Sequence, residues 1–197
     1  MDLAALTPIV IVLVIGAMSP GPSLAILIRN TMEGGKKQGV SCGVGHGIGF
    51  GIYAFIAVAG IAQLKASASG AAELLEIVGG LFLLLLAGLM LRGSNEDNGH
   101  QSSGRRGFTE GFLIAFLNPK ILAFLIAIFS QFVQPDFTWG ERALVALIAM
   151  CIDGGWYVLV ALIISGTPLL TKLEENARKF EQMMGILLAG LGIWILL

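Results

Sequence analysis

The feature that most constrains the fold of this chain is a series of six apolar stretches, each close to the length of a membrane-spanning helix. A soluble domain is typically about 25% charged, whereas only 13% of these residues are charged and 56% are hydrophobic. Lipid is therefore the dominant solvent, and the sequence predicts an all-α integral membrane protein with six transmembrane helices. The predicted spans are residues 6–28, 42–64, 74–91, 109–133, 143–166 and 181–197.

The longest hydrophilic stretch is GSNEDNGHQSSGRRG at residues 93–107, which predicts a flexible loop between two halves of three spans each. We expect one transmembrane domain over residues 1–197, with a first repeat over 1–92 and a second over 108–197. Because each half has an odd number of spans, similar halves would have opposite orientations in the membrane.

Lysine and arginine predict the orientation, because cytoplasmic loops carry an excess of both. Nine of them follow the first, third and fifth spans, against two, Lys65 and Arg142, on the other side. The three loops are therefore predicted to be cytoplasmic and both termini outside. The nine are Arg29, Lys36, Lys37, Arg92, Arg105, Arg106, Lys172, Arg178 and Lys179. A net charge of −1 gives no reason to expect nucleic acid as a partner.

Two of the predicted spans contain helix breakers near their middle. The first reads Ser19-Pro20-Gly21-Pro22, and the fourth reads Asn118-Pro119-Lys120. A proline in a helix interior costs about 3 kcal/mol, and interrupted spans at corresponding positions of two halves indicate the binding site of a transporter. We therefore predict inverted repeats whose first and fourth helices are interrupted near the midplane, with these seven residues at the substrate site.

Two charged residues lie deep in apolar stretches. Lys120 is about twelve residues into the fourth span and Asp153 about ten into the fifth, which places both near the midplane at 1.5 Å per residue. A charge at that depth is by default functional, so both are candidates for substrate contact and Asp153 for proton coupling. The alternatives are a Lys120 that reaches the interface from a helix end, or a purely structural Lys120–Asp153 ion pair.

The start of the second span holds a histidine among glycines. His46 is interpreted first as a satisfied interfacial residue and second as a proton relay. No second histidine or carboxylate lies at helical spacing from His46, so no metal site is predicted. The glycines form two rows of small residues that favour close helix packing, or a hinge for alternating access. They are Gly43, Gly47 and Gly51 in one row and Gly45 and Gly49 in the other.

Motifs of soluble catalysis are missing from the sequence: it has no GxSxG, HExxH or Walker pattern, and no cofactor is predicted. We therefore predict that the chain is not an enzyme. A membrane scaffold or a subunit of a larger complex remains a competing class, as does an intramembrane enzyme with residues drawn from several spans.

The stretch SPGPSLAILIRNTMEGGKKQGVSCGVGHGIG resembles the opening of the LysE/RhtB family of amino-acid exporters. That family has PGP in its first span, Asn-Pro-Lys in its fourth and an aspartate followed by aromatic residues in its fifth, found here as Asp153-Gly-Gly-Trp156-Tyr157. The resemblance implies a bacterial inner-membrane exporter of small amino acids or their derivatives, driven by protons and forming a homo-oligomer such as a dimer. More distant relatives handle metal cations, which makes a cation exporter the nearest alternative.

These features together predict a mechanism. The N-terminus of a half-helix readily binds a carboxylate, and Lys120 would add a full charge to the same group. Asp153 would receive the substrate's ammonium group or, in exchange, a proton, while Asn118 and Ser19 would orient the substrate by hydrogen bonds. The scarcity of acids within the spans favours a neutral amino acid over a dibasic one.

Overall fold

A computed structural model describes residues 3–19, 21–67, 70–92 and 107–164, together with 176, 179, 182, 183, 185, 186, 188–190, 192–194, 196 and 197. Over these residues the chain forms six helices, in agreement with the predicted all-α class. They are α1 (Leu3–Ala17), α2 (Pro22–Ser67), α3 (Ala71–Arg92), α4 (Gly107–Phe116), α5 (Pro119–Phe132) and α6 (Trp139–Ile164).

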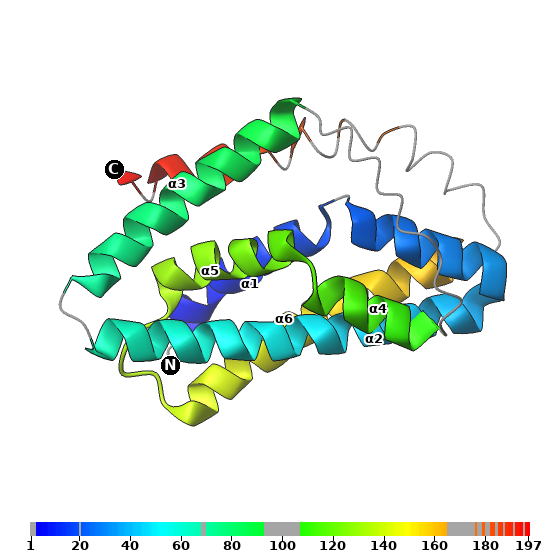
Figure 1. Cartoon of the computed structure of the whole chain (residues 1–197), viewed down its shortest axis with the longest axis horizontal. Helices are drawn as coiled ribbons and strands as arrows, with labels where there is room; N and C mark the ends of the chain where they lie inside the picture. Colours follow the sequence, from blue (N-terminus) through cyan, green and yellow to red (C-terminus); the bar gives the residue numbers. More distant parts are fainter. Residues whose placement is uncertain are drawn as a thin grey trace.

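Helix α2 is the longest element. Its contacts with α6 and with α4 are more extensive than the contacts between any other two helices (Figure 1). Helices α1 and α5 lie between this group and α3, which contacts α5. The described residues near the C-terminus run beside α3, where Gly185 approaches Leu91 and Gly192 approaches Leu84. The main apolar core is shared by α1, α2, α3, α5 and α6.

The connection between the first two predicted spans differs from the expectation. We predicted a loop near residues 29–41, but α2 continues through this region and only Gly35 departs from helical geometry, with φ 70° and ψ −177°. Glycine has no Cβ and adopts positive φ at little cost, so a single residue reverses the chain. Figure 1 shows the first part of α2 and its longer second part joined at this turn.

Both predicted interruptions occur. Helix α1 ends at Ala17 and α2 begins at Pro22, and α4 ends at Phe116 before α5 begins at Pro119. The axes of α4 and α5 differ by 54° across their break. Each second helix starts with a proline, which is favoured at the first helical position because its missing N–H would have no partner there. The two breaks thus place two helix N-termini in the interior of the structure.

The glycines of α2 face two different helices. A methyl group built on Gly43 would lie 2.9 Å from the backbone nitrogen of Val158 in α6. One built on Gly47 would lie 2.6 Å from Cα of Gly154, also in α6. One built on Gly51 would lie 2.6 Å from Cβ of Met150, also in α6. The other row, Gly45 and Gly49, approaches the backbone oxygens of Phe108 and Phe112 in α4. Close approach on both sides explains why α2 packs so extensively.

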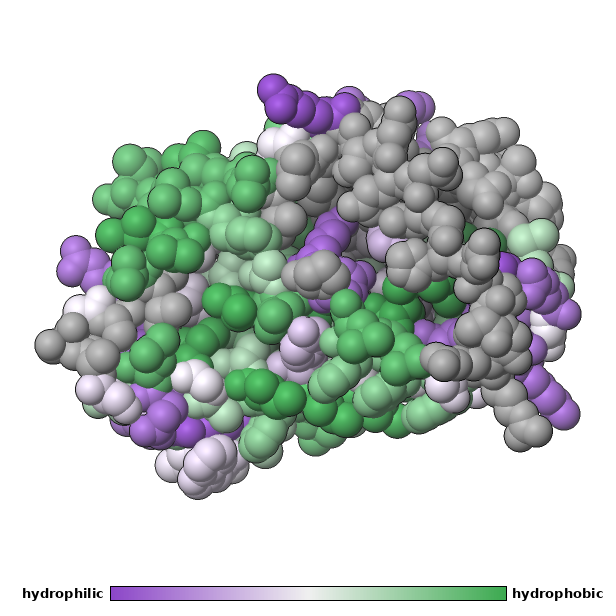
Figure 2. All heavy atoms as spheres, in the orientation of Figure 1, coloured by the Kyte–Doolittle hydropathy of each residue, from purple (hydrophilic) through white to green (hydrophobic). Residues whose placement is uncertain are grey.

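By length and composition, α2 and residues Trp139–Ile163 of α6 could each cross a membrane. Helices α4 and α5 pass the same test when taken together across their bend, and residues Leu6–Ala17 form a shorter apolar helix. Large apolar side chains are exposed along α2, α3 and α6, and Figure 2 shows a broad apolar surface. The apolar helices fit a membrane protein, while the count of six spans stays a prediction and the last predicted span lies partly outside the described residues.

Candidate functional site

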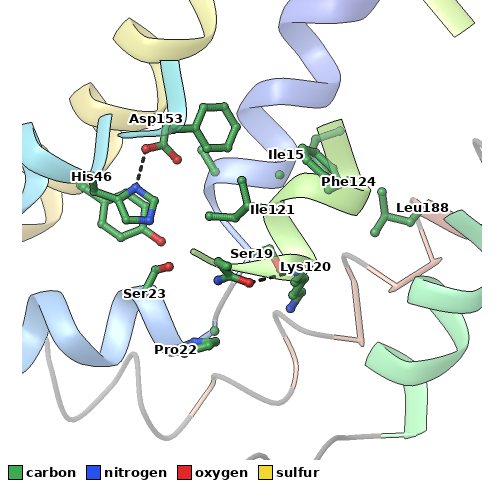
Figure 3. A pocket seen from close by; sticks show the side chains of 16 residues that line it. Ile15, Ser19, Pro22, Ser23, His46, Lys120, Ile121, Phe124, Asp153 and Leu188 are labelled. Carbon is green, nitrogen blue, oxygen red and sulfur yellow. Dashed lines mark hydrogen bonds and ion pairs between the residues drawn. The ribbon is translucent and has the colours of Figure 1, made fainter. Parts of the chain in front are cut away.

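A pocket lies where the two helix breaks meet (Figure 3). Its free space, counted together with the open solvent at its mouth, is about 670 Å³. Its apolar wall includes Ile15, Phe50, Ile121, Phe124 and Leu188. Its polar side chains are Ser19, Ser23, His46, Asn118, Lys120, Asp153 and Tyr157.

One part of the pocket is positively charged. Asn118 caps the N-terminus of α5 by accepting a hydrogen bond at 3.0 Å from the backbone N–H of Lys120. The ammonium group of Lys120 lies at the other break, since a methyl group built on Gly21 would be 3.7 Å from its Nζ. Helix α2 also begins here, where the backbone N–H groups of Leu24 and Ala25 donate to the Gly21 carbonyl. Two helix N-termini and one lysine therefore favour a bound anion.

Another part of the pocket holds a buried histidine–aspartate pair. Nδ1 of His46 lies 2.6 Å from Oδ2 of Asp153, and the two residues are 1% and 2% exposed. The imidazole stacks on the ring of Tyr157, with 4.0 Å between centroids. An aspartate that binds one ring nitrogen of a histidine fixes the orientation of the imidazole.

Two side-chain polar atoms of the described residues are buried without a hydrogen-bond partner, and both belong to residues that line this pocket. They are Oγ of Ser19 and Nε2 of His46. A buried polar atom left unsatisfied costs about 1–3 kcal/mol. A polar molecule bound in the pocket would therefore gain most by forming hydrogen bonds with these two atoms.

Most of the predicted site residues come together here. Ser19, Gly21, Pro22, Asn118, Lys120, Asp153 and His46 all line the pocket, whereas Pro20 lies outside the described residues. Pro119 begins α5. The five α2 glycines lie at the contacts with α4 and α6, and the pocket does not include them.

The position of His46 differs from its first interpretation as an interfacial residue: it is buried and paired with Asp153. Sequence reasoning also assigned no role to Ser23 and Tyr157. Tyr157 lies four residues after Asp153, one helical turn away on the same face of α6, and that spacing was the signal that could have identified it. The alternative prediction was an ion pair between Lys120 and Asp153. Among the described residues no such pair is found, and Asp153 contacts His46 instead.

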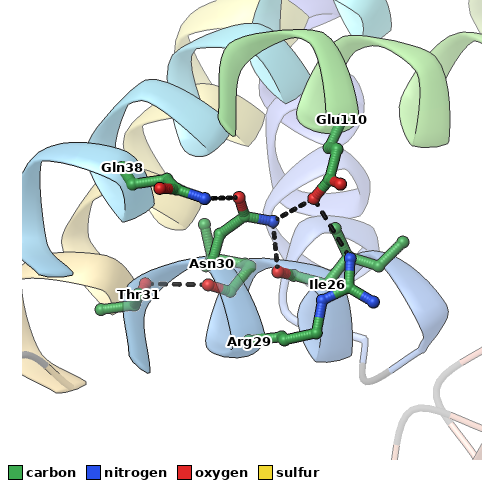
Figure 4. Close-up of polar contacts among 7 residues, drawn as sticks. Ile26, Arg29, Asn30, Thr31, Gln38 and Glu110 are labelled. Carbon is green, nitrogen blue, oxygen red and sulfur yellow. Dashed lines mark hydrogen bonds and ion pairs between the residues drawn. The ribbon is translucent and has the colours of Figure 1, made fainter. Parts of the chain in front are cut away.

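A second polar cluster, not predicted from the sequence, joins the two parts of α2 to α4 near the Gly35 turn (Figure 4). Nδ2 of the buried Asn30 donates to Oε2 of Glu110 at 2.6 Å, and Arg29 contacts the same oxygen at 3.2 Å. Nε2 of Gln38 donates to Oδ1 of Asn30 at 2.8 Å. The cluster fixes the turn against α4. Its sequence signal was Glu110, an acid at the edge of an apolar span.

The comparison with protein families identifies the class of protein to which this architecture belongs. The model of the LysE type translocator family matches residues 14–197, a range that contains both helix breaks and every residue of the pocket. The chain belongs to this family. The translocator is therefore a transport protein and not an enzyme, as the missing catalytic motifs predicted.

Curated relatives of the translocator match over most of their length. It is 24% identical over 196 residues to the threonine efflux proteins of Escherichia coli (strain K12) and Salmonella typhi, covering 93% of each chain. It is 25% identical over 179 residues to the leucine efflux protein of Enterobacter sp. (strain 638), covering 87% of this chain and 85% of the relative. No solved structure matches the translocator.

Proposed function

We propose that the protein exports a small neutral amino acid from the bacterial cytoplasm in exchange for protons. The observation that carries this proposal is the distribution of charge in the pocket, where Lys120 and two helix N-termini accompany the buried His46–Asp153 pair. A free amino acid is a zwitterion, so it needs a positive site for its carboxylate and an acceptor for its ammonium group. Efflux of threonine and leucine, which gives the matched relatives their names, supports the same substrate class.

The carboxylate would bind where Lys120 approaches the break between α1 and α2. A carboxylate is favoured at a helix N-terminus by roughly 0.3–1 kcal/mol, and a hydrogen bond to a charged group adds about 1.5–3 kcal/mol. The Ser19 hydroxyl, which is buried without a partner, would orient the same group. The substrate side chain would lie against the apolar wall formed by Ile121 and Phe124.

The ammonium group, or a proton in its place, would be received by Asp153 together with His46. Both are almost fully buried and their only described ion pair is with each other. A buried carboxylate needs a positive partner. Movement of the substrate outward and of a proton inward would supply that partner alternately.

The arrangement of the breaks supports alternating access by inverted repeats. Helix α1 contacts α5, while α4 contacts the first part of α2 through Glu110 and Arg29. Each first half-helix thus packs beside the second half-helix of the other repeat, as expected for two crossing interrupted helices. Six spans, a homodimer, an inner-membrane location and outside termini are retained as predictions from sequence.

Export of a metal cation by the same architecture is less favoured. Within the described part of the chain, no three residues of histidine, cysteine, aspartate or glutamate come together as a metal site. The pocket contains one such pair, and its lysine would repel a cation.

The experiment that tests this proposal uses purified protein in liposomes loaded with radiolabelled threonine or leucine, with lysine as the dibasic comparison. We expect efflux of a neutral amino acid that accelerates when the outside is made acidic and that acidifies the lumen. Efflux of lysine alone, or transport of no amino acid at all, would contradict the proposed function. Efflux at a rate that does not depend on the pH gradient would contradict the proton coupling but leave amino-acid export in place.

A further inference from the structure

We infer that Nε2 of His46 is the single acceptor for which the substrate's ammonium group and the transported proton compete. This inference rests on the proposed function and assigns its exchange step to one atom. Asp153 then acts as a positioning residue that holds the imidazole through Nδ1.

The geometry makes Nε2 the atom that faces the substrate. Nδ1 is bound to Asp153 at 2.6 Å, and one face of the ring is covered by Tyr157 at 4.0 Å. Nε2 is buried without a hydrogen-bond partner in a residue that lines the pocket. Figure 3 shows the ring between Asp153 and the cavity, on the side where Ser23 and Ile121 lie.

The chemistry of imidazole makes the two ligands exclusive. When Nδ1–H donates to the Asp153 carboxylate, Nε2 of the neutral ring has a lone pair and accepts a hydrogen bond. That lone pair can accept an N–H of the substrate's ammonium group. Once Nε2 is protonated it becomes a donor, and an ammonium group can no longer bind there. In the exchange, the proton on Nε2 passes to water in the pocket as the ammonium group arrives.

Charge balance makes the exchange obligatory. With a proton on Nε2, the imidazolium and the Asp153 carboxylate sum to zero. With a neutral imidazole and a bound ammonium group, the carboxylate and the ammonium also sum to zero. A site holding neither would bury the Asp153 charge, at 2% exposure, without a positive partner, which costs several kcal/mol. The site therefore crosses between its two states only when it is loaded with one or the other.

The other charged and titratable groups around His46 leave this assignment intact. From α6 they are Asp153 and Tyr157, and from α5 the pocket receives Lys120. Glu110 of α4 is bound to Arg29 and Asn30, Cys42 lies one turn away on α2 itself, and α1 carries no charged residue over Leu3–Ala17.

The test compares the wild type with His46→Gln in substrate counterflow, in which labelled and unlabelled amino acid exchange at equal pH on both sides. In the wild type we expect protons to compete with substrate. As the pH is lowered, the half-saturating substrate concentration should rise close to tenfold per pH unit once most of the imidazole is protonated. The maximal rate at saturating substrate should stay constant. In His46→Gln, counterflow should continue with weaker binding and no pH dependence, and a pH gradient should no longer drive net efflux.

The measurement in the wild type needs no variant, so a folding defect in His46→Gln cannot hide the answer; its thermal unfolding in detergent serves as the check. An N-acetylated substrate analogue, which lacks the ammonium group, should not exchange. Competition that persists in His46→Gln, or a wild-type affinity that is constant with pH, would overturn the inference. If the wild type moves no amino acid, the proposed function itself fails, so the two failures are distinct.

Discussion

Gly47 of α2 and Gly154 of α6 touch so closely that a methyl group built on Gly47 would lie 2.6 Å from Cα of Gly154. Each is the next residue after a member of the buried ion pair, His46 and Asp153. The backbone contact therefore sets how far apart the two charged side chains start. The glycine contact next to each residue thus helps to set the 2.6 Å distance between Nδ1 of His46 and Oδ2 of Asp153.

Substitution of Gly47 by alanine tests this relationship. The added methyl group must push α6 away from α2, and overpacking of this kind typically costs 1–3 kcal/mol. We expect a lower midpoint of thermal unfolding in detergent and a loss of proton-driven efflux. The matched control is Gly60→Ala in the same helix, because nothing lies within 4 Å of a methyl group built there. Equal effects of the two substitutions would show that helix propensity, and not the contact with α6, is responsible.

Asn118 gives a second prediction. Its side chain accepts the backbone N–H of Lys120 and caps α5, and loss of such a cap costs about 0.5–2 kcal/mol. Asn118→Ala should lower the unfolding midpoint and weaken substrate binding, because the cap also holds the N-terminus of α5 at the pocket. Asn118→Ser retains a capping oxygen and should stay close to wild type in stability. Thermal unfolding and counterflow affinity, measured on both variants, separate a capping role from a purely substrate-binding one, for which serine would be as harmful as alanine.

The sequence predicted the helical class and both breaks because prolines act locally. Pro22 and Pro119 each fix φ and lack an N–H, so a continuous helix through either would lose a backbone hydrogen bond and clash with the preceding turn. The two interrupted segments could therefore be predicted from the sequence without knowledge of packing.

What could not be predicted depends on distant partners. The turn at Gly35 looked like a loop, because only the positive φ of one residue distinguishes a sharp reversal from a longer connection. His46 seemed interfacial because hydropathy placed the start of the second span near residue 42, whereas the helix that carries it continues through that boundary. Its pairing with Asp153 joins residues 107 apart in the chain, and no local pattern encodes that.

The Glu110 cluster leads to a third prediction. Replacing Glu110 by alanine leaves the buried Asn30 without its 2.6 Å partner and removes the ion pair of Arg29. Nδ2 of Asn30 keeps its 2.9 Å bond to the Ile26 carbonyl, but one of its two N–H groups loses its partner. A buried N–H without a partner costs about 1–3 kcal/mol, so thermal stability in detergent should fall by several degrees. Glu33→Ala, which removes an exposed carboxylate from the same region, is the control and should leave the midpoint unchanged. A Glu110→Ala midpoint equal to that of the control would mean that the cluster contributes nothing to the fold.

Lys120 is the residue that most directly tests recognition of the carboxylate. Lys120→Gln keeps a long polar side chain but removes the charge at the α1–α2 break. Because a hydrogen bond to a charged group is worth about 1.5–3 kcal/mol, the half-saturating concentration in counterflow should rise roughly tenfold to a hundredfold. Lys37→Gln, at an exposed position beside the Gly35 turn, should leave it unchanged.

A substrate analogue separates a direct contact from a general loss of folding. The carboxamide of the same amino acid lacks the negative charge, so it should compete weakly in the wild type. It should compete as well in Lys120→Gln as in the wild type, because a carboxamide has no negative charge for the lysine to bind. If the substitution instead weakens carboxylate and carboxamide by the same factor, Lys120 supports the shape of the pocket and the carboxylate binds elsewhere, leaving the two helix N-termini as the positive groups of the site.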